Sequence, residues 1–243
     1  MLKWKSNPGG STPGVRNMDI IAELRSLENP KNIAGMKRFG IQGNKILGIS
    51  VVELRKIAKK IGKSHRVALK LWDSGIHEAR ILACLVDIPG EVSETQMDTW
   101  VKDFDSWDVC DQVCMNLFDK MPIAFKKAGE WARREEEFVR RAGFALMAAL
   151  AVHDKKATNK QFSAFFPIII KYSTDERNFV KKAVNWALRQ IGKRNRELRI
   201  MAIQQAKTIL ERHPDSRSAR WIARDAMREL LKISKLGSSN PRG

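Results

Sequence analysis

The spacing of the apolar residues restricts this chain to an all-helical fold. Between residues 18 and 235 nearly every segment repeats its apolar positions with the period of an amphipathic helix. No segment alternates apolar and polar residues as a half-buried strand does. The pattern predicts one domain over residues 18–235, built from about eleven or twelve helices joined by short loops.

Capping residues and prolines mark several expected helix boundaries. Ser50 and Glu53 have the spacing of a capping box, and Asn159 precedes another helical run. Pro122 suits the first turn of a helix, because its missing N–H loses no hydrogen bond there. Pro167 stands inside an apolar helical segment and should kink or split it.

A weak internal repeat indicates how the helices stack. The segment FVRRA (138–142) recurs as FVKKA (179–183), 41 residues later, and Arg220 follows Lys182 by 38 residues. A period of about 40 residues, with two helices in each unit, is typical of HEAT-type solenoids. Such solenoids are curved, with one set of helices along a concave surface. We therefore expect an all-α, HEAT-like α-solenoid (an α-α superhelix) with a concave basic groove.

The positive charge is concentrated in the second half of the chain. The sequence has 45 Lys+Arg and 27 Asp+Glu, a net charge of +18. Residues 1–121 hold 18 basic and 15 acidic residues, whereas residues 122–243 hold 27 and 12. In that half the basic residues are interleaved with apolar ones at helical spacing, which indicates a charged face on folded helices. Nucleic acid is the favoured partner; an anionic membrane surface or a merely well-solvated face are the alternatives.

Other features of the sequence restrict where in the cell the protein is expected to be. The longest apolar run, residues 144–152, is too short to cross a bilayer, and the N-terminus lacks the apolar region of a secretory signal. Three cysteines cannot form a paired disulfide framework, so we expect a reducing, intracellular compartment. The location expected for the chain is the cytoplasm of a bacterial or archaeal cell. Residues 1–17 and 236–243 are rich in Gly, Pro and Ser and are expected to be flexible tails.

The pair Trp107 and Asp111 is the most informative feature for function. Both lie in the segment SWDVCDQVCMNLFDKM (106–121), which is expected to be one helix. Residues four apart stand about 40° from each other around a helix, so the indole and the carboxylate lie side by side. They fall at the edge of the apolar face. An ordinary surface aspartate beside a half-buried tryptophan remains the alternative.

Arg141, Lys182 and Trp186 are further candidates for contact with a polyanion. Arg141 belongs to the apolar helix EEEFVRRAGFALMAALAV (135–152), where small alanines on its stripe would let a bulky ligand approach. It is equally suited to pairing with a structural carboxylate. Lys182 and Trp186 stand four residues apart on the face of a third helix, although a core position is the default for an isolated tryptophan.

Motifs for metal or cofactor chemistry are missing from the sequence. Cys110 and Cys114 lie one helical turn apart, but none of the four histidines has ligand spacing relative to them. We interpret both cysteines as small core residues. The sequence contains no dinucleotide-binding glycine motif, no P-loop and no nucleophile motif. We expect no metal and no cofactor.

From about residue 19 to residue 235 the chain resembles the AlkD-like DNA alkylation repair family, all-helical HEAT-like DNA glycosylases. The matching stretches are FDSWDVCDQVCMNLF, EEEFVRRAGFALMAALAVHDKK and DERNFVKKAVNWALRQIGKRN. The family uses two tryptophans, an aspartate and an arginine on successive inner helices. Trp107 and Trp186 match the tryptophans, Asp111 matches the catalytic aspartate and Arg141 matches the arginine.

The resemblance implies a function and a set of roles. It implies excision of cationic N3- or N7-alkylpurines from double-stranded DNA, with Asp111 as the catalytic residue and Arg141 on a phosphate beside the lesion. Phe39, ahead of an LGI turn, takes the place of a further aromatic residue that is usually Tyr. Some family branches bind DNA without glycosylase activity, so a non-catalytic module for damaged or branched DNA is the alternative. A monomer is expected.

Overall fold

The structure, a computed structural model, describes residues 19–41 and 45–238, and every regular element in this part of the chain is a helix. The elements are α1 (Ile20–Ser26), α2 (Pro30–Arg38), α3 (Val51–Ile61), α4 (His65–Asp73), α5 (His77–Val86), η1 (Pro89–Glu91), α6 (Glu94–Lys102), α7 (Trp107–Asn116), η2 (Phe118–Lys120), α8 (Ala124–Trp131), α9 (Glu137–His153), α10 (Asn159–Ser163), α11 (Phe166–Tyr172), α12 (Asn178–Lys193), α13 (Arg196–Arg212) and α14 (Arg217–Ser238). The described residues thus hold fourteen α-helices and two short 3₁₀ helices, more than the eleven or twelve helices expected.

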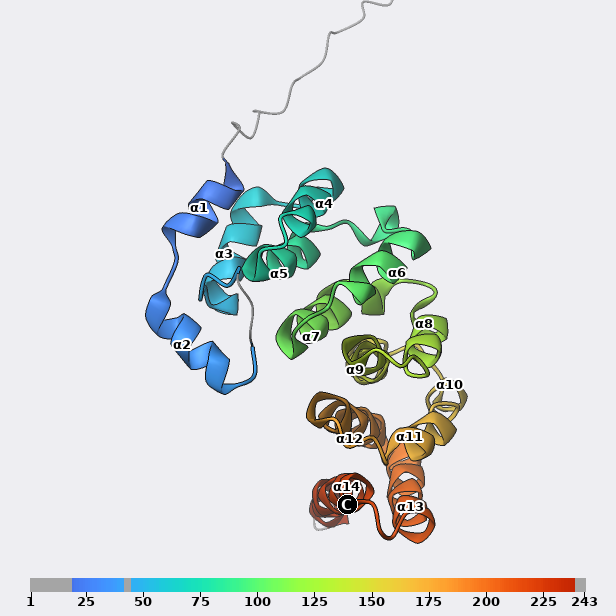
Figure 1. The fold of residues 1–243 in the computed structure, drawn as a ribbon. Coiled ribbons are helices and arrows are strands. Elements are labelled where there is room, and N and C mark those ends of the chain that lie inside the picture. The colour runs from blue at the N-terminus through green and yellow to red at the C-terminus, as the bar shows by residue number, and fades with distance from the viewer. Residues whose placement is uncertain (1–18, 42–44, 239–243) are drawn as a thin grey trace, which may run out of the picture.

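The helices form a curved double row, which confirms the expected HEAT-like solenoid (Figure 1). Helices α3, α5, α7, α9, α12 and α14 contact one another in succession and form the inner row. Helices α4, α8 and α13 pack behind their inner neighbours, with α6, α10 and α11 on the same outer side. Helix α2 lies apart from this stack, across the open side of the curve.

Sequence signals placed some boundaries correctly and others not. Ser50 caps α3 by accepting a hydrogen bond from the amide of Glu53. Pro167 does split its segment, because α10 ends at Ser163 and α11 begins at Phe166. Pro122, however, lies in the turn before α8 and not in its first turn. The cap of α10 is Thr158, in a capping box with Gln161, so Asn159 is already helical.

The expected single helix over residues 106–121 is interrupted. Helix α7 ends at Asn116, and Leu117 has non-helical dihedral angles before the 3₁₀ turn η2. This break brings Phe118 into the aromatic core next to Trp100 and Trp131. It also turns the Asp119 carboxylate inward, where it pairs with His153.

The LGI turn is fixed by a buried carboxylate on the inner row. Glu78 of α5 is fully buried and accepts hydrogen bonds from the backbone amides of Leu47, Gly48 and Ile49. Gly48 has a φ of 73°, and a side chain there would collide with the carbonyl oxygen of Asn29. The turn therefore ties the segment that follows α2 to the solenoid.

The C-terminal end of the predicted domain lies further along the chain than expected, and the predicted N-terminal tail falls outside the described residues. Residues 1–17, expected to be a tail, lie outside the described residues. Helix α14 continues to Ser238, past the boundary expected at residue 235, and residues 239–243 lie outside the described part. Within residues 19–41 and 45–238, none of the helices combines the length and the apolar character needed to span a bilayer.

Candidate nucleic-acid interface

The inner row carries a cavity of about 420 Å³ that contains every site residue predicted from the sequence. Those residues are Phe39, Trp107, Asp111, Arg141, Lys182 and Trp186. They come from the end of α2 and from α7, α9 and α12, so the first and the last of them are 147 positions apart in the sequence. The structure brings the whole predicted set together.

The tryptophans fall into two groups. Trp72, Trp100 and Trp131 are buried in the core, where Trp72 and Trp100 stack with ring centroids 4.0 Å apart. The other described tryptophans, Trp107, Trp186 and Trp221, all line the cavity. These three rings cluster at one partly exposed site, where a ligand could contact their faces, whereas the other three fill the core.

Trp107 is oriented by a hydrogen bond to a residue far from it in the sequence. Its indole Nε1 donates a hydrogen bond to the backbone carbonyl of Phe39, at 3.0 Å across 68 residues of sequence. The neighbouring Gly40 has a φ of 78° and lies so close to the Phe179 ring that a Cβ atom would be 2.8 Å from it. The end of α2 is thus seated against α7 and α12, and the exposed Phe39 ring forms one wall of the cavity.

Asp111 and Arg141 form a nearly buried ion pair. Arg141 donates from Nε to Oδ1 at 3.1 Å and from Nη2 to Oδ2 at 2.8 Å, while Nη1 donates to the carbonyl of Phe179 at 2.7 Å. The side chains are 6% and 15% exposed for Arg141 and Asp111 respectively. Of the two interpretations left open by the sequence, the structure shows Arg141 paired with a carboxylate.

This environment has opposing effects on the Asp111 carboxylate. Burial raises its pKa above the ordinary value, and the positive charge and hydrogen bonds of Arg141 act against that rise. Burial and the neighbouring Asp111 charge likewise oppose each other at Arg141, where the net effect is a raised pKa. The bidentate geometry holds both carboxylate oxygens in a fixed orientation at the cavity wall.

Sequence reasoning missed five of the cavity residues. They are Phe179, Asn185, Arg189, Trp221 and Asp225. Phe179 begins the repeated segment FVKKA, and Trp221 follows Arg220 of the same repeat, so that signal could have placed both on the inner row. The spacing of WIARD (221–225), which matches WDVCD (107–111), could have identified Asp225 as well.

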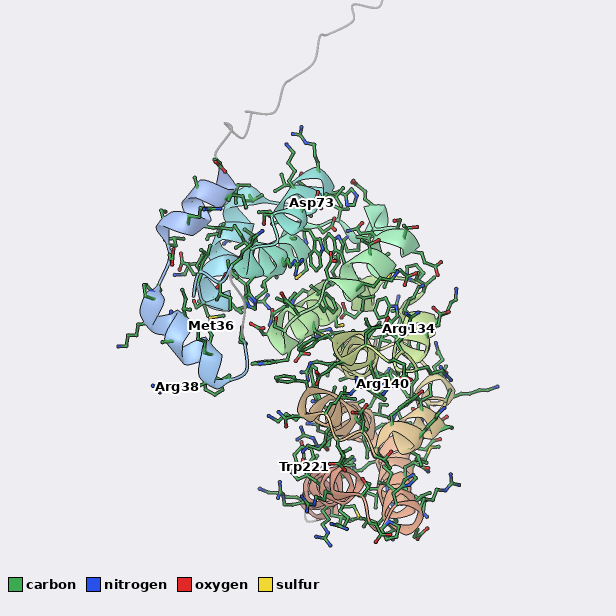
Figure 2. The ribbon with its side chains drawn as sticks, viewed as in Figure 1. Met36, Arg38, Asp73, Arg134, Arg140 and Trp221 are labelled. Carbon is green, nitrogen blue, oxygen red and sulfur yellow. The ribbon has the colours of Figure 1, made fainter. Side chains whose placement is uncertain are left out.

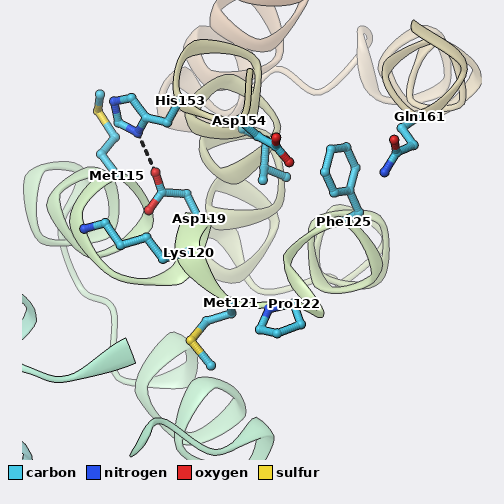
Figure 3. Close-up of a pocket in the computed structure, with 10 residues that line it drawn as sticks. Met115, Asp119, Lys120, Met121, Pro122, Phe125, His153, Asp154 and Gln161 are labelled. Atoms are coloured by element: carbon cyan, nitrogen blue, oxygen red, sulfur yellow. Dashed lines mark hydrogen bonds and ion pairs between the residues drawn. The ribbon is translucent and has the colours of Figure 1, made fainter. Parts of the chain in front are cut away.

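Two further cavities adjoin the inner row. One, of about 800 Å³, lies between α2 and helices α5 and α7, and shares Phe39 and Trp107 with the site described above. The other, of about 720 Å³, is shown in Figure 3 and lies between η2, α8 and the end of α9. There the buried Asp119 carboxylate pairs with the half-exposed His153.

The acidic, cysteine and histidine residues do not form a metal site in the described structure. Over residues 19–41 and 45–238, no three of these side chains are placed so that they could hold a metal ion together. The three cysteines are all buried and unpaired. Burial raises the pKa of Cys84 to about 12.

A curved stack of helix pairs with an aromatic and charged site on its inner row defines a HEAT-like helical-repeat protein. The chain belongs to the DNA alkylation repair enzyme family, whose model matches residues 20–230. It is also similar to a solved structure described as "a new family of proteins related to the HEAT-like repeat DNA glycosylases with affinity for branched DNA structures". That likeness has a TM-score of 0.69 and 21% identity, and covers 77% of this chain and 80% of the other.

Two curated bacterial proteins are also similar to the chain. They are the uncharacterized proteins Lin0241 of Listeria innocua, 25% identical, and Lmo0209 of Listeria monocytogenes, 24% identical, each over 128 residues. The matched stretch covers 51% of this chain and 57% of each relative, so the likeness spans little more than half of their length.

Proposed function

We propose that this protein is a DNA glycosylase that removes cationic N3- or N7-alkylated purines from duplex DNA, acting in the cytoplasm on chromosomal DNA. The observation that carries the proposal is the meeting of Trp107, Asp111, Arg141 and Trp186 in one open cavity. Membership of the DNA alkylation repair enzyme family supports it, as does the net positive charge of the second half of the chain.

The chemistry of the lesion fits this group of side chains. An N3- or N7-alkylated purine is a cation whose glycosidic bond is already weak, so its departure needs little help from a general acid. The faces of Trp107 and Trp186 attract positive charge, each contributing about 0.5–2 kcal/mol. The site therefore needs only to hold the lesion and to stabilise the sugar as the base leaves.

Asp111 is assigned to the sugar. The glycosidic bond breaks with both electrons going to the base, which becomes neutral, and positive charge develops on the deoxyribose. An ionised carboxylate in a partly dry cavity stabilises that charge and orients the water that adds to C1′ and loses a proton. Each 1.4 kcal/mol of such stabilisation increases the rate about tenfold.

The roles of the cationic residues follow from their exposure. The Arg141 guanidinium donates three hydrogen bonds, two to Asp111 and one to the carbonyl of Phe179. We therefore assign it to positioning the carboxylate, in place of the phosphate contact that the family resemblance implied. Lys182 is exposed on the next inner helix and is available to a phosphate oxygen. Other basic residues of the second half would follow the DNA backbone without reading sequence.

The deciding experiment is a base-release assay. Duplex DNA treated with a methylating agent is incubated with the parent protein and with Asp111→Asn, and released bases are separated and quantified. The proposal predicts release by the parent, loss of release in Asp111→Asn, and similar DNA affinity for both. Equal rates for the two proteins would remove Asp111 from catalysis.

A non-catalytic DNA-binding module is the second candidate. It is favoured by the buried Asp111–Arg141 pair, which would be a structural link, and by the solved relative described as having affinity for branched DNA. This candidate predicts that the parent binds branched or damaged DNA and releases no base. Base release above the spontaneous rate would exclude it.

A further inference from the structure

A second tryptophan–aspartate pair faces the same cavity. Trp221 and Asp225 stand four residues apart on α14, as Trp107 and Asp111 do on α7. Residues four apart share one face of a helix, and all four side chains line the cavity. The cavity is therefore bounded on two sides by an aromatic ring next to a carboxylate, with α9 and α12 between them.

Asp225 is held from the neighbouring inner helix, as Asp111 is. Asn185 of α12, only 2% exposed, donates from Nδ2 to Oδ2 of Asp225 at 2.7 Å. The buried partner of Asp225 is thus a neutral amide, whereas the buried partner of Asp111 is a guanidinium. The cations near Asp225 are Arg189, whose Nε is 3.7 Å from Oδ2, and Arg228, whose 80% exposed side chain pairs with Oδ1. A ligand can displace an exposed side chain such as Arg228, and Oδ1 then becomes free to accept new hydrogen bonds.

Trp221 supplies an exposed aromatic surface beside this carboxylate. The residue is 41% exposed and lies by α12 and α14 (Figure 2). The Lys181 ammonium lies over the ring, 5.4 Å from its centroid. An exposed tryptophan next to a cation is the arrangement on which unpaired nucleic-acid bases stack, while the cation meets the backbone phosphate. The proposed excision chemistry uses neither Trp221 nor Asp225.

We infer that Trp221 and Asp225 form a base-reading subsite for an unpaired guanine. The inference rests on the proposal that the cavity binds DNA. Guanine presents two adjacent donors on its pairing edge, N1–H and the 2-amino group, which match the two oxygens of a carboxylate. Adenine and cytosine place a ring acceptor next to their amino group, and thymine flanks its one donor with carbonyl oxygens, so a carboxylate fits them less well.

The test uses unmodified DNA that differs by one amino group. Fluorescence anisotropy compares a labelled duplex with one extrahelical guanine, the same duplex with inosine there, and the fully paired duplex. Inosine keeps the ring and N1–H but lacks the 2-amino group. The parent should bind the guanine duplex about tenfold more tightly than the inosine duplex, the value of a hydrogen bond to a charged group.

Two variants assign the effect to its residues. Asp225→Asn should bind the guanine and inosine duplexes equally, because the substituted amide no longer offers two acceptors. Trp221→Ala should lose about fivefold or more on both extrahelical duplexes and little on the paired one, whereas Trp221→Phe should retain most of the affinity. Leu231→Ala, an exposed change on α14 outside the cavity, is the matched control and should behave as the parent.

The outcomes separate this inference from the proposed function. Equal binding of guanine and inosine by the parent would overturn the subsite, and so would a guanine preference that survives in Asp225→Asn. Asp111→Asn should keep the guanine preference while losing base release. If the parent excises alkylpurines but does not discriminate guanine from inosine, the proposed function holds and the subsite is refuted. If it discriminates guanine but releases no base, the subsite holds and the glycosylase proposal is refuted.

Discussion

The Arg141 guanidinium donates two parallel hydrogen bonds to the Asp111 carboxylate, joining α9 to α7 across 30 residues of sequence. This pair explains how a carboxylate that burial disfavours is kept oriented at the wall of a cavity. It also makes the arginine a structural requirement of the site.

Removing one partner of the pair should destabilise the fold. Arg141→Ala leaves the Asp111 charge buried without a partner, and we expect the free energy of unfolding to fall by about 3–5 kcal/mol, measured by urea denaturation. The double variant Asp111→Leu/Arg141→Met should recover much of this loss, since it removes both charges. The exposed pair Arg134–Glu136 supplies the control: Arg134→Ala should leave the unfolding midpoint unchanged. A double variant no more stable than Arg141→Ala would contradict the explanation.

The pH dependence of base release should report the raised pKa of Asp111. Burial raises that pKa, so the carboxylate takes up a proton at a higher pH than an ordinary aspartate does. In the proposed mechanism the ionised form is the active one, and the rate should therefore fall on acidification before ordinary aspartates titrate. Acidification has the opposite effect on the stability of the fold. Because the pKa of the Asp111 carboxyl is raised in the folded state, its protonation favours folding at acidic pH. Single-turnover rates, corrected for spontaneous depurination, measure the profile; a rate that stays constant down to the ordinary aspartate range would contradict it.

The salt dependence of DNA binding should identify the phosphate contacts. Lys182→Gln removes one exposed cation from the cavity, and we expect the slope of log K against log salt to become shallower by about 1. Lys59→Gln, an equally conservative change at an exposed position of α3, should leave the slope as in the parent. An unchanged slope in Lys182→Gln would place the DNA elsewhere on the molecule.

The cysteines should be unreactive while the protein is folded. Cys84, Cys110 and Cys114 are all buried, and burial raises the pKa of Cys84 to about 12, far above the pH of a thiol assay. A thiol reagent at mildly alkaline pH should modify none of them in the native protein and all three in denaturant. Rapid modification of the native protein would show that the inner helices open readily.

Gly143 should tolerate no side chain. A Cβ atom there would lie 2.3 Å from the amide nitrogen and 2.7 Å from the Cα atom of Ala132, both backbone atoms of the segment after α8. Gly143→Ala should lower the free energy of unfolding by about 1–3 kcal/mol in thermal or urea unfolding. Gly35→Ala is the matched control, since nothing lies within 4 Å of its added carbon and alanine favours the helix. Equal stability of the two variants would refute the close approach of α8 and α9.

Signals in the sequence accounted for much of the fold, and the resemblance to a known family singled out the predicted site residues. Helical periodicity, the repeat around Lys182 and the cap at Ser50 are all patterns of residue types along the chain, so they could be interpreted without the structure. The break at Leu117 could not, because it follows from the packing of Phe118 against aromatic residues of other helices.

Pairing between side chains was the part that the sequence left open. The helical wheel places Asp111 at the edge of an apolar face, and the sequence leaves open whether Arg141 meets a ligand or a structural carboxylate. Only the crossing of α7 and α9 shows that the two residues bind each other. Likewise the contact between Gly40 and Phe179 joins segments far apart in sequence. Trp221 stands next to Arg220 of the repeat, yet its place in the cavity depends on the curvature of the whole stack.

The hydrogen bond from Trp107 to the carbonyl of Phe39 has a consequence for how the site can be assembled. In a solenoid each repeat contacts mainly its neighbours, so a shortened chain can keep the remaining repeats folded. The Phe39 carbonyl, by contrast, reaches a residue 68 positions away. A protein lacking the segment up to α2 should keep helices α7 to α14 in register, but the cavity would lose its Phe39 wall and Trp107 would lose this hydrogen bond. The stability of the repeats and the completeness of the cavity should therefore be separable in this chain.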